Sequence, residues 1–444
     1  MQSTNSLGTE PIGKILIKQS VPAGIGFLVM SINSIVDTIF IGHYVGANAI
    51  AAIAVVMPIS FFISSIGLAI GVGGASIISR ALGADNKEKA SKTFGTQVIL
   101  TLGMSLVLLS LGYIFADGVL DLFGGKGSIL EPAKIYFNVV LFGTPFLAWA
   151  MMSNNVVRAE GKPKVAMMVM VLPAVINIIL DPILIVGFNM GLFGAALATT
   201  VAYIISAFYV LIFFLRGKSA LQMNIGYFRI NPLIIKEIFQ IGGVTLARQG
   251  SITLLIIVLN QTLFRFGGES AVAIYGIISR LMMFSLFPVM GVVQGYMPIV
   301  GFNFGAKLNG RVVETVRMAL IYGTGLACVV FAIIVFFPSM IVKSFTTDPE
   351  LLSVAPSALR TVFLALPMIS LQLIGSSYFQ AIGRPGPALL LTLTKQGFFL
   401  IPLVLILPYY FGLEGVWYSF PIADVLATVI TAFYLSGAIR KLKK

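Results

Sequence analysis

The sequence predicts an all-α integral membrane protein with twelve transmembrane helices in two six-helix bundles. Three observations carry this prediction: 58% of the 444 residues are hydrophobic, long uncharged runs recur along the chain, and the chain repeats itself at half its length. A soluble domain has about 25% charged residues, whereas this chain has 10%. The composition therefore excludes a water-soluble enzyme, a nucleic-acid-binding protein and a disordered chain. The single cysteine, Cys328, excludes a disulfide scaffold.

Uncharged or nearly uncharged runs define the predicted helices, because a transmembrane helix needs about 20 apolar residues. Residues 38–79 carry no charge over 42 positions, which fits the end of one helix, a turn near 42–48 and a second helix. Barrel strands would alternate in polarity in blocks of about ten residues, and these runs do not. The predicted spans are approximately 15–41, 49–79, 93–116, 135–157, 165–187, 190–215, 238–264, 270–304, 312–336, 354–380, 386–410 and 412–438.

Basic residues are distributed unevenly between the two predicted sides of the membrane. The two termini and the loops after even-numbered helices hold 21 of the 29 basic residues, the loops after odd-numbered helices hold five, and the spans hold three. Cytoplasmic loops accumulate Lys and Arg. We therefore expect both termini in the cytoplasm, and the net charge of +13 needs no nucleic-acid partner.

An internal repeat with an offset of about 222 residues divides the chain into two halves. The matching segments are Gly73 and residues 83–84 with Gly295 and 305–306, 159–163 with 381–385, 48–51 with 270–273, and 191–194 with 412–415. Because six is even, both halves enter the membrane from the same side, so the pseudo-twofold axis lies along the membrane normal. We expect an N-terminal lobe over 1–215, a cytoplasmic linker over 216–237 and a C-terminal lobe over 238–444. Such a repeat indicates alternating access around a central site.

Acidic residues inside the predicted helices mark a candidate ion site, since a charge there costs about 2.5–3.5 kcal/mol. Asn33 and Asp37 share a helix face, as do Asn177 and Asp181, and the next helix offers Thr199. Carboxylate, amide and hydroxyl oxygens suit Na⁺, and a carboxylate with a raised pKa suits a proton. The cluster therefore favours a coupling ion, H⁺ or Na⁺. The alternative is that the two aspartates only cap, pair or hydrogen-bond for structure.

The second half lacks this cluster. Asp37 aligns best with Gln261, Asp181 with Leu403 and Asn177 with Phe399. We therefore expect the coupling ion to bind in the N-terminal lobe only.

Four further residues inside predicted spans have two interpretations each. Lys395 and Asp424 lie on neighbouring helices, where they either form a structural ion pair or serve function. Arg248 either faces a central cavity or extends to the cytoplasmic edge. Pro22 interrupts the first helix about four turns before Asp37. The helix at Pro22 either bends with the state of Asp37 or has a static kink.

Several motifs resemble the multidrug and toxic compound extrusion (MATE) family over essentially the full length of the chain. They are residues 36–42 (VDTIFIG), 79–84 (SRALGA), 158–163 (RAEGKP), 177–182 (NIILDP) and 298–307 (PIVGFNFGAK). The resemblance implies two bundles that form a V, and cation-coupled export of amphipathic, often cationic drugs. It also implies a multi-pass protein of the prokaryotic plasma (inner) membrane that works as a monomer in contact with membrane lipids.

The resemblance is closer to the archaeal and DinF-like branch of the family than to the NorM-like branch. In that branch the equivalents of Asp37, Asn177, Asp181 and Thr199 form the cation site, and the proline equivalent to Pro22 bends. The NorM-like branch also uses acidic residues in helices 7 and 10, and this sequence has none there. A cation site in the C-terminal lobe is therefore not expected.

The main alternative function is a lipid-linked oligosaccharide or lipid flippase of the same superfamily. The peptidoglycan-precursor type resembles this architecture but usually has fourteen helices and an arginine-lined cavity. A passive channel or an intramembrane enzyme is less consistent with the sequence. The sequence contains no metal-binding motif and no nucleophile–base pair, and its one histidine is His43. We therefore expect no enzymatic activity, no resident metal and no organic cofactor.

Overall fold

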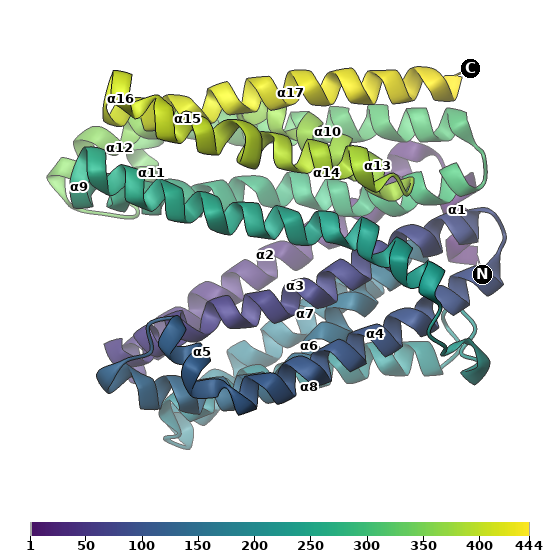
Figure 1. Cartoon of the computed structure of the whole chain (residues 1–444), viewed down its shortest axis with the longest axis horizontal. Helices are drawn as coiled ribbons and strands as arrows, with labels where there is room; N and C mark the ends of the chain where they lie inside the picture. Colours follow the sequence, from purple (N-terminus) through teal and green to yellow (C-terminus); the bar gives the residue numbers. More distant parts are fainter. Residues whose placement is uncertain (1, 444) are drawn as a thin grey trace. The chain divides into compact units, whose positions relative to one another are not determined.

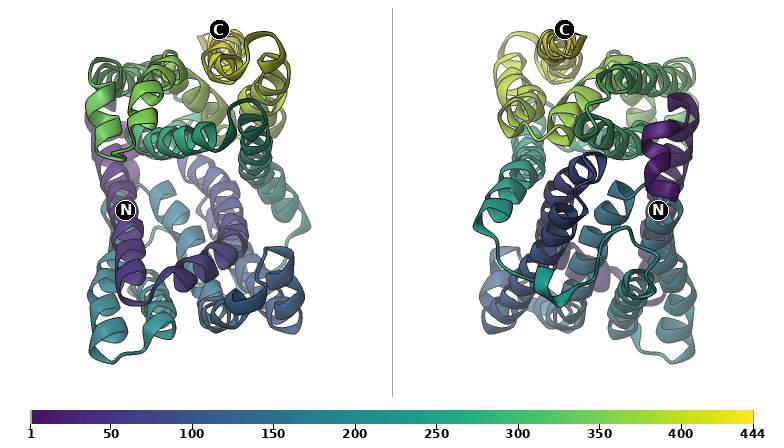
Figure 2. Two further views of the ribbon diagram at one scale, coloured as in Figure 1. Left: turned by 90° about the vertical axis from the view of Figure 1, so that its left-hand side faces the viewer. Right: turned by 90° about the vertical axis from the view of Figure 1, so that its right-hand side faces the viewer.

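The structure is a computed structural model that describes residues 2–443, and every regular element in that range is a helix (Figure 1). The chain forms two compact units, and within each unit the helices run along a common direction, so that Figure 2 shows them nearly end-on. The prediction of an all-α membrane protein built from two six-helix bundles is confirmed.

Unit 1 comprises the chain up to Thr9 together with Val21–Thr245. Its elements are α1 (Gln2–Thr9), most of α2 (Ile12–Tyr44), α3 (Ala47–Gly83), α4 (Lys87–Ile114), α5 (Ala116–Leu122), η1 (Gly127–Ile129), α6 (Leu130–Ala159), α7 (Pro163–Asp181), η2 (Pro182–Gly187), α8 (Gly191–Leu215), η3 (Ile225–Tyr227) and the first turns of α9 (Pro232–Gly305). The central helix α6 packs against α3, α4, α7 and α8.

Unit 2 comprises Glu10–Ser20 and the chain from Leu246 onward. Its elements are the first turns of α2, the remainder of α9, α10 (Asn309–Phe336), α11 (Pro338–Lys343), α12 (Pro349–Val362), η4 (Leu366–Met368), α13 (Ile369–Ala381), α14 (Pro385–Leu393), η5 (Thr394–Leu400), α15 (Ile401–Ile406), α16 (Pro408–Phe411) and α17 (Leu413–Lys443). Its core contains Leu259, Trp417 and Phe420, all at most 1% exposed.

The helices are long and apolar enough to cross a membrane twelve times. Eleven segments among the described residues meet this criterion, and one of them is α9, with 74 residues. The backbone of α9 breaks at Gly268, where φ is 63°, so α9 is two consecutive spans. Glycine adopts this conformation without the steric cost that a side chain imposes. The break falls between the predicted spans 238–264 and 270–304.

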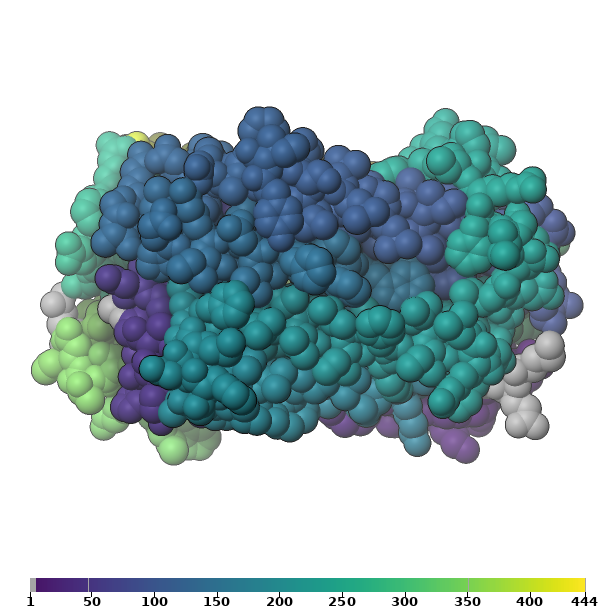
Figure 3. Space-filling view, turned by 90° about the horizontal axis from the view of Figure 1, so that it is seen from below, coloured from purple at the N-terminus to yellow at the C-terminus, as the bar shows by residue number. Residues whose placement is uncertain are grey.

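The surface of unit 1 that α4, α5 and α8 form is apolar, as is typical of a surface that contacts lipid. Figure 3 views the molecule from the side on which α4, α5 and α8 lie. These helices carry exposed large apolar side chains, including Leu106, Leu122 and Phe208. In a soluble protein such a surface would be an interaction site or an aggregation risk.

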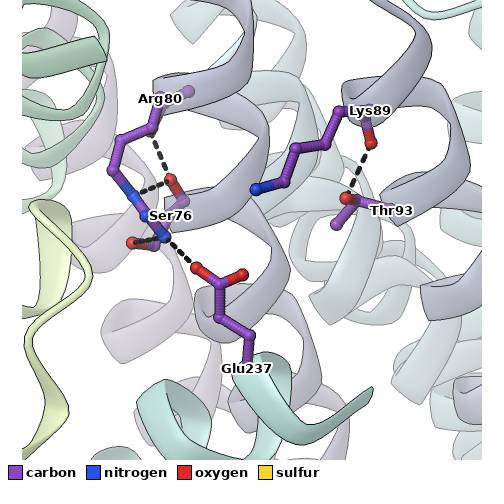
Figure 4. A network of polar contacts seen from close by, with 6 residues as sticks. Ser76, Arg80, Lys89, Thr93 and Glu237 are labelled. Atoms are coloured by element: carbon purple, nitrogen blue, oxygen red, sulfur yellow. Dashed lines mark hydrogen bonds and ion pairs between the residues drawn. The ribbon is translucent and has the colours of Figure 1, made fainter. Parts of the chain in front are cut away.

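The first turns of α9 are anchored to unit 1 by a close helix contact and an ion pair. A Cβ atom at Gly73 would collide with the carbonyl oxygen of Ile238. Nearby, Arg80 Nη2 donates to Glu237 Oε1 at 2.8 Å, and Arg80 Nε donates to the Ser76 carbonyl at 3.0 Å (Figure 4). Glycine at position 73 therefore allows the two backbones to approach.

The first turns of α2 are anchored to unit 2 in the corresponding way. A Cβ at Gly295, the repeat partner of Gly73, would lie 2.7 Å from the backbone nitrogen of Ser20. Arg311 Nη2 donates to the Glu10 carbonyl at 2.7 Å, and Arg311 Nε donates to Asn303 Oδ1 at 3.0 Å. The repeated glycines thus have the same function in both halves.

The segment between α8 and α9 is held against unit 1 by a buried carboxylate. Glu160 is fully buried and accepts from Ser219 Oγ and the Ala220 backbone N–H, both at 2.7 Å. Burial raises the pKa of the Glu160 carboxyl, while these bonds and Lys162 at 3.6 Å oppose the rise. Helix α9 begins at Pro232, inside the predicted linker 216–237.

Candidate functional site

Three helices of unit 1 bring the predicted ion-site residues together. Asp37 and Asn33 lie one turn apart on α2, Asn177 and Asp181 one turn apart on α7, and Thr199 lies on α8. Asp181 is the last residue of α7 and precedes the π-helical segment η2, which begins at Pro182. Proline has no N–H to continue the helix, and short π-helical segments are frequent at functional sites.

Hydrogen bonds hold three of these side chains in a fixed arrangement. Asn177 Nδ2 donates to Asp181 Oδ1 at 3.2 Å and to Thr199 Oγ1 at 3.4 Å. Thr199 Oγ1 in turn donates to the Ala195 carbonyl at 3.1 Å. Asn177 is 4% exposed and Asp181 is fully buried. Both amide hydrogens of Asn177 are thus used, and they link Asp181 to Thr199.

The carboxyl groups of Asp37 and Asp181 lie within hydrogen-bonding reach of each other. Asp37 Oδ1 and Asp181 Oδ2 are buried and accept no hydrogen bond from another group, and the same is true of Asn33 Oδ1. Within residues 2–443, no Lys, Arg or His forms an ion pair with either aspartate. Two facing carboxyl groups cannot both stay ionised without a proton or a cation between them.

Two tyrosines border the carboxylate pair and were not predicted from the sequence. Tyr136 on α6 faces Thr199, and both aspartates are among its electrostatic neighbours. Tyr203 on α8 also faces Asp37. Tyr203 lies one helical turn after Thr199, so the i, i+4 spacing could have indicated it. Tyr136 has no such signal, because only the fold brings α6 next to α2.

In unit 2 the intramembrane charges form a different cluster. Lys395 Nζ lies 2.6 Å from Asp424 Oδ1; the Asp424 side chain is buried at 6% exposure, and the Lys395 side chain is partly buried at 14%. Gln372 Nε2 donates to Asp424 Oδ1 at 3.1 Å and to Thr428 Oγ1 at 2.9 Å. The sequence allowed the Lys395–Asp424 pair, but nothing in it pointed to Gln372 as a partner.

The remaining predicted residues lie outside both clusters. Gln261, the repeat partner of Asp37, is exposed on α9. Arg248 is partly buried, and its Nη2 has no hydrogen-bond partner. Pro22 lies inside α2, which continues as a helix through it, and the division of α2 between the two units falls at Ser20 and Val21.

A sequence model described as MatE matches residues 22–183 and again residues 246–406. The chain belongs to the MatE family. The two matches begin 246 − 22 = 224 residues apart, close to the offset of the internal repeat, so each half of this MatE chain is one copy of the family unit. Proteins of this family are membrane transporters rather than enzymes.

Curated relatives match this MatE chain over almost its whole length. The multidrug export protein MepA of Staphylococcus aureus (strain MSSA476) is 31% identical over 422 residues, which cover 94% of this chain and 92% of MepA. MepA of Staphylococcus haemolyticus (strain JCSC1435) is 29% identical over 422 residues, covering 95% and 93%.

Solved structures of MATE proteins share the fold of this MatE chain. A MATE structure in the bent conformation superposes with a TM-score of 0.94 at 26% identity, covering 100% of this chain and 98% of that one. A MATE structure in the straight conformation gives 0.94 at 25% identity, covering 100% and 99%. A MOP-superfamily transporter from Pyrococcus furiosus gives 0.93 at 26% identity, covering 100% and 99%.

Proposed function

We propose that this protein exports amphipathic, often cationic drugs by antiport against H⁺ or Na⁺, and that the coupling ion binds between Asp37 and Asp181. The proposal depends on one observation. Two carboxyl groups face each other in an apolar helical unit, and no basic side chain among residues 2–443 forms an ion pair with them. A proton or a cation at this position removes their repulsion, and its release restores it.

The surrounding side chains support either ion. Asn177, Thr199 and the two aspartates offer amide, hydroxyl and carboxylate oxygens within one cluster, and hard cations prefer oxygen ligands. The same carboxylates can instead share a single proton, as coupled pairs do. The set matches the site that the family resemblance implies for the archaeal and DinF-like branch.

Drug export is supported by the relatives, which carry the name multidrug export protein at 31% identity over 94% of this chain. We extend that activity to this protein, in the plasma membrane and as a monomer. Both termini lie on the cytoplasmic side in this proposal, with residues 216–237 as the linker between an N-terminal and a C-terminal lobe.

Pro22 provides a hinge in this mechanism. It lies one residue beyond the boundary at which α2 passes from unit 2 to unit 1. Proline removes one backbone hydrogen bond and weakens the helix there. We propose that α2 bends at Pro22 when Asp37 gains or loses its ion, which links the ion site to the movement between lobes.

Transport into proteoliposomes with a single imposed gradient tests this proposal. The full chain should take up a lipophilic cation in exchange for H⁺ or Na⁺. The gradient that drives this uptake when it is imposed alone, pH or Na⁺, identifies the coupling ion. Asp37→Asn should reduce this transport to the level of empty vesicles, because one carboxylate no longer pairs with the ion. Ser34→Ala, on the same helix and exposed, is the matched control and should keep full activity. Equal transport by wild type and Asp37→Asn would show that Asp37 does not couple.

A further inference from the structure

The segment between α8 and α9 carries large apolar side chains that the described part of the chain leaves exposed. Ile225 is 89% exposed, Leu233 79% and Ile230 66%, and Ile225 is the most exposed large apolar side chain among the described residues. The segment lies at the end of unit 1 where α4 begins (Figure 1). Three such side chains on one short connection, outside the predicted spans, indicate an interaction surface.

Hydrogen bonds to α4 hold this segment before and after Ile225. The backbone N–H of Gln222 donates to Ser91 Oγ at 2.9 Å, and Thr96 Oγ1 donates to the carbonyl of Arg229 at 3.0 Å. With the backbone attached to α4 at both points, the exposed apolar side chains between them and beyond can be covered only by something outside unit 1.

Exposed basic side chains accompany the apolar ones. Arg229 lies within the segment, and Lys236 lies three residues after Leu233 on α9, so that Leu233 and Lys236 share a helix face. Neither cation forms an ion pair among the described residues. The one acidic residue in 216–237 is Glu237, and it pairs with Arg80 at 2.8 Å. The segment therefore presents apolar side chains together with positive charge that has no partner in the chain.

The position of the segment favours lipid as the partner that covers it. It joins α8 and α9, and both helices are long and apolar enough to cross a membrane. Exposed apolar side chains continue into each of them, with Leu215 at the end of α8 (65%) and Phe239 on α9 (41%). Phe239 lies three residues beyond Lys236, so the face that carries Leu233 and Lys236 continues into the membrane span.

We propose that residues 225–236 form an interfacial anchor that binds anionic phospholipids. Ile225, Ile230 and Leu233 enter the boundary between headgroups and acyl chains, and Arg229 and Lys236 bind phosphate groups beside them. Apolar side chains combined with Lys and Arg are typical of segments that lie in the membrane interface. Anionic headgroups attract basic side chains that lie next to a membrane span. The segment that joins the two halves of the chain is therefore also a lipid-binding site.

A fluorophore on the segment tests its position at the membrane. Ile225→Cys in a Cys328→Ser background, labelled with the environment-sensitive dye NBD in lipid nanodiscs, should show blue-shifted emission and quenching by lipids with a nitroxide near the headgroup. Glu88→Cys, at a position 63% exposed beside Lys92 on α4, is the matched control and should show emission as in water and quenching by iodide. Water-like emission at position 225 would assign this face to water or to another protein and overturn the proposal. Leu233→Cys repeats the measurement if Ile225→Cys does not fold.

The lipid preference tests the role of the basic side chains. Quenching of the label at position 225 by nitroxide-labelled phosphatidylglycerol should exceed quenching by the corresponding phosphatidylcholine. Arg229→Gln should lower the relative affinity for the anionic lipid about fivefold. Lys343→Gln removes the same charge from another exposed position, at the end of α11, and should leave the ratio unchanged. Equal quenching by the two lipids, or no change in Arg229→Gln, would overturn the assignment to anionic headgroups. None of these measurements requires transport, so their outcome is independent of the proposed antiport.

Discussion

Asp181 in unit 1 and Lys395 in unit 2 both lie on the fifth membrane span of their half, and each is next to or inside a π-helical segment. Asp181 faces a second carboxyl group, Asp37, and has no basic partner among the described residues. Lys395 faces Asp424 at 2.6 Å and is neutralised by it. In the proposed mechanism the first half therefore takes up an external cation, whereas the second half contains its own positive charge.

The difference shows which features the two copies share. The glycines that allow close helix contacts, Gly73 and Gly295, are the same in both halves and serve the same packing. The two carboxylates are not shared, since Gln261 and Leu403 occupy the positions of Asp37 and Asp181. This one close contact is therefore common to both halves, whereas the buried charges are not.

The largest expected effect comes from removing charges from each of the two clusters separately and comparing the results. Asp181→Asn should abolish the response of transport to an ion gradient, because the facing carboxylate pair is lost. The charge-neutral double variant Lys395→Met/Asp424→Asn should keep that response, because it leaves the facing carboxyl groups of Asp37 and Asp181 unchanged. The measurement is the ratio of uptake with a gradient to uptake without one in proteoliposomes. If the double variant also lost its response to the gradient, both clusters would be needed for coupling, and the two units would not differ in this function.

The next largest effect concerns the symmetric part of the comparison. Gly73→Ala and Gly295→Ala each place a Cβ against the backbone of Ile238 or Ser20, which should cost about 1–3 kcal/mol through overpacking. Thermal unfolding in detergent measures the loss.

Two glycines with open space around them serve as matched controls. Gly103 on α4 and Gly325 on α10 have no atom near an added Cβ. Gly103→Ala and Gly325→Ala should be stabilising by about 0.5–1 kcal/mol, because alanine loses less conformational entropy in a helix. If only Gly73→Ala destabilised the protein, the two glycines would not be equivalent.

The sequence alone predicts most of the fold, because lipid imposes strong constraints on hydropathy and on the placement of basic residues. The sequence also predicts that Asp37, Asn177, Asp181 and Thr199 form one candidate site, since an aspartate inside a membrane span is rare and energetically costly. Tyr136 and the Asp424 partner Gln372 could not be predicted, because an isolated tyrosine or glutamine in a span gives no periodic signal. Their roles depend on which helices become neighbours, which is a property of the packed structure.

The smallest expected effect tests a third difference between the halves, at the end of α6. Glu160 accepts hydrogen bonds from Ser219 and Ala220, whereas its repeat partner is the apolar Ile382. Glu160→Ile leaves both donors unsatisfied, at a cost of about 1–3 kcal/mol. Because the linker then opens locally, cleavage by trypsin after Arg216 or Lys218 should speed up about fivefold for each kcal/mol lost. The Tm should change little.

A matched change in unit 2 separates this anchor from general packing. Ile382→Val removes one buried methylene at the equivalent turn and should cost about 0.5–1.5 kcal/mol, with no effect on cleavage of the linker. Glu160→Gln keeps one acceptor oxygen and should fall between wild type and Glu160→Ile. Equal cleavage rates in wild type and Glu160→Ile would mean that other contacts hold the linker, among them the bond from Thr96 Oγ1 to the Arg229 carbonyl at 3.0 Å. The acidic residue of the first repeat would then have no anchoring role, and the asymmetry of charge would be confined to the interior of the units.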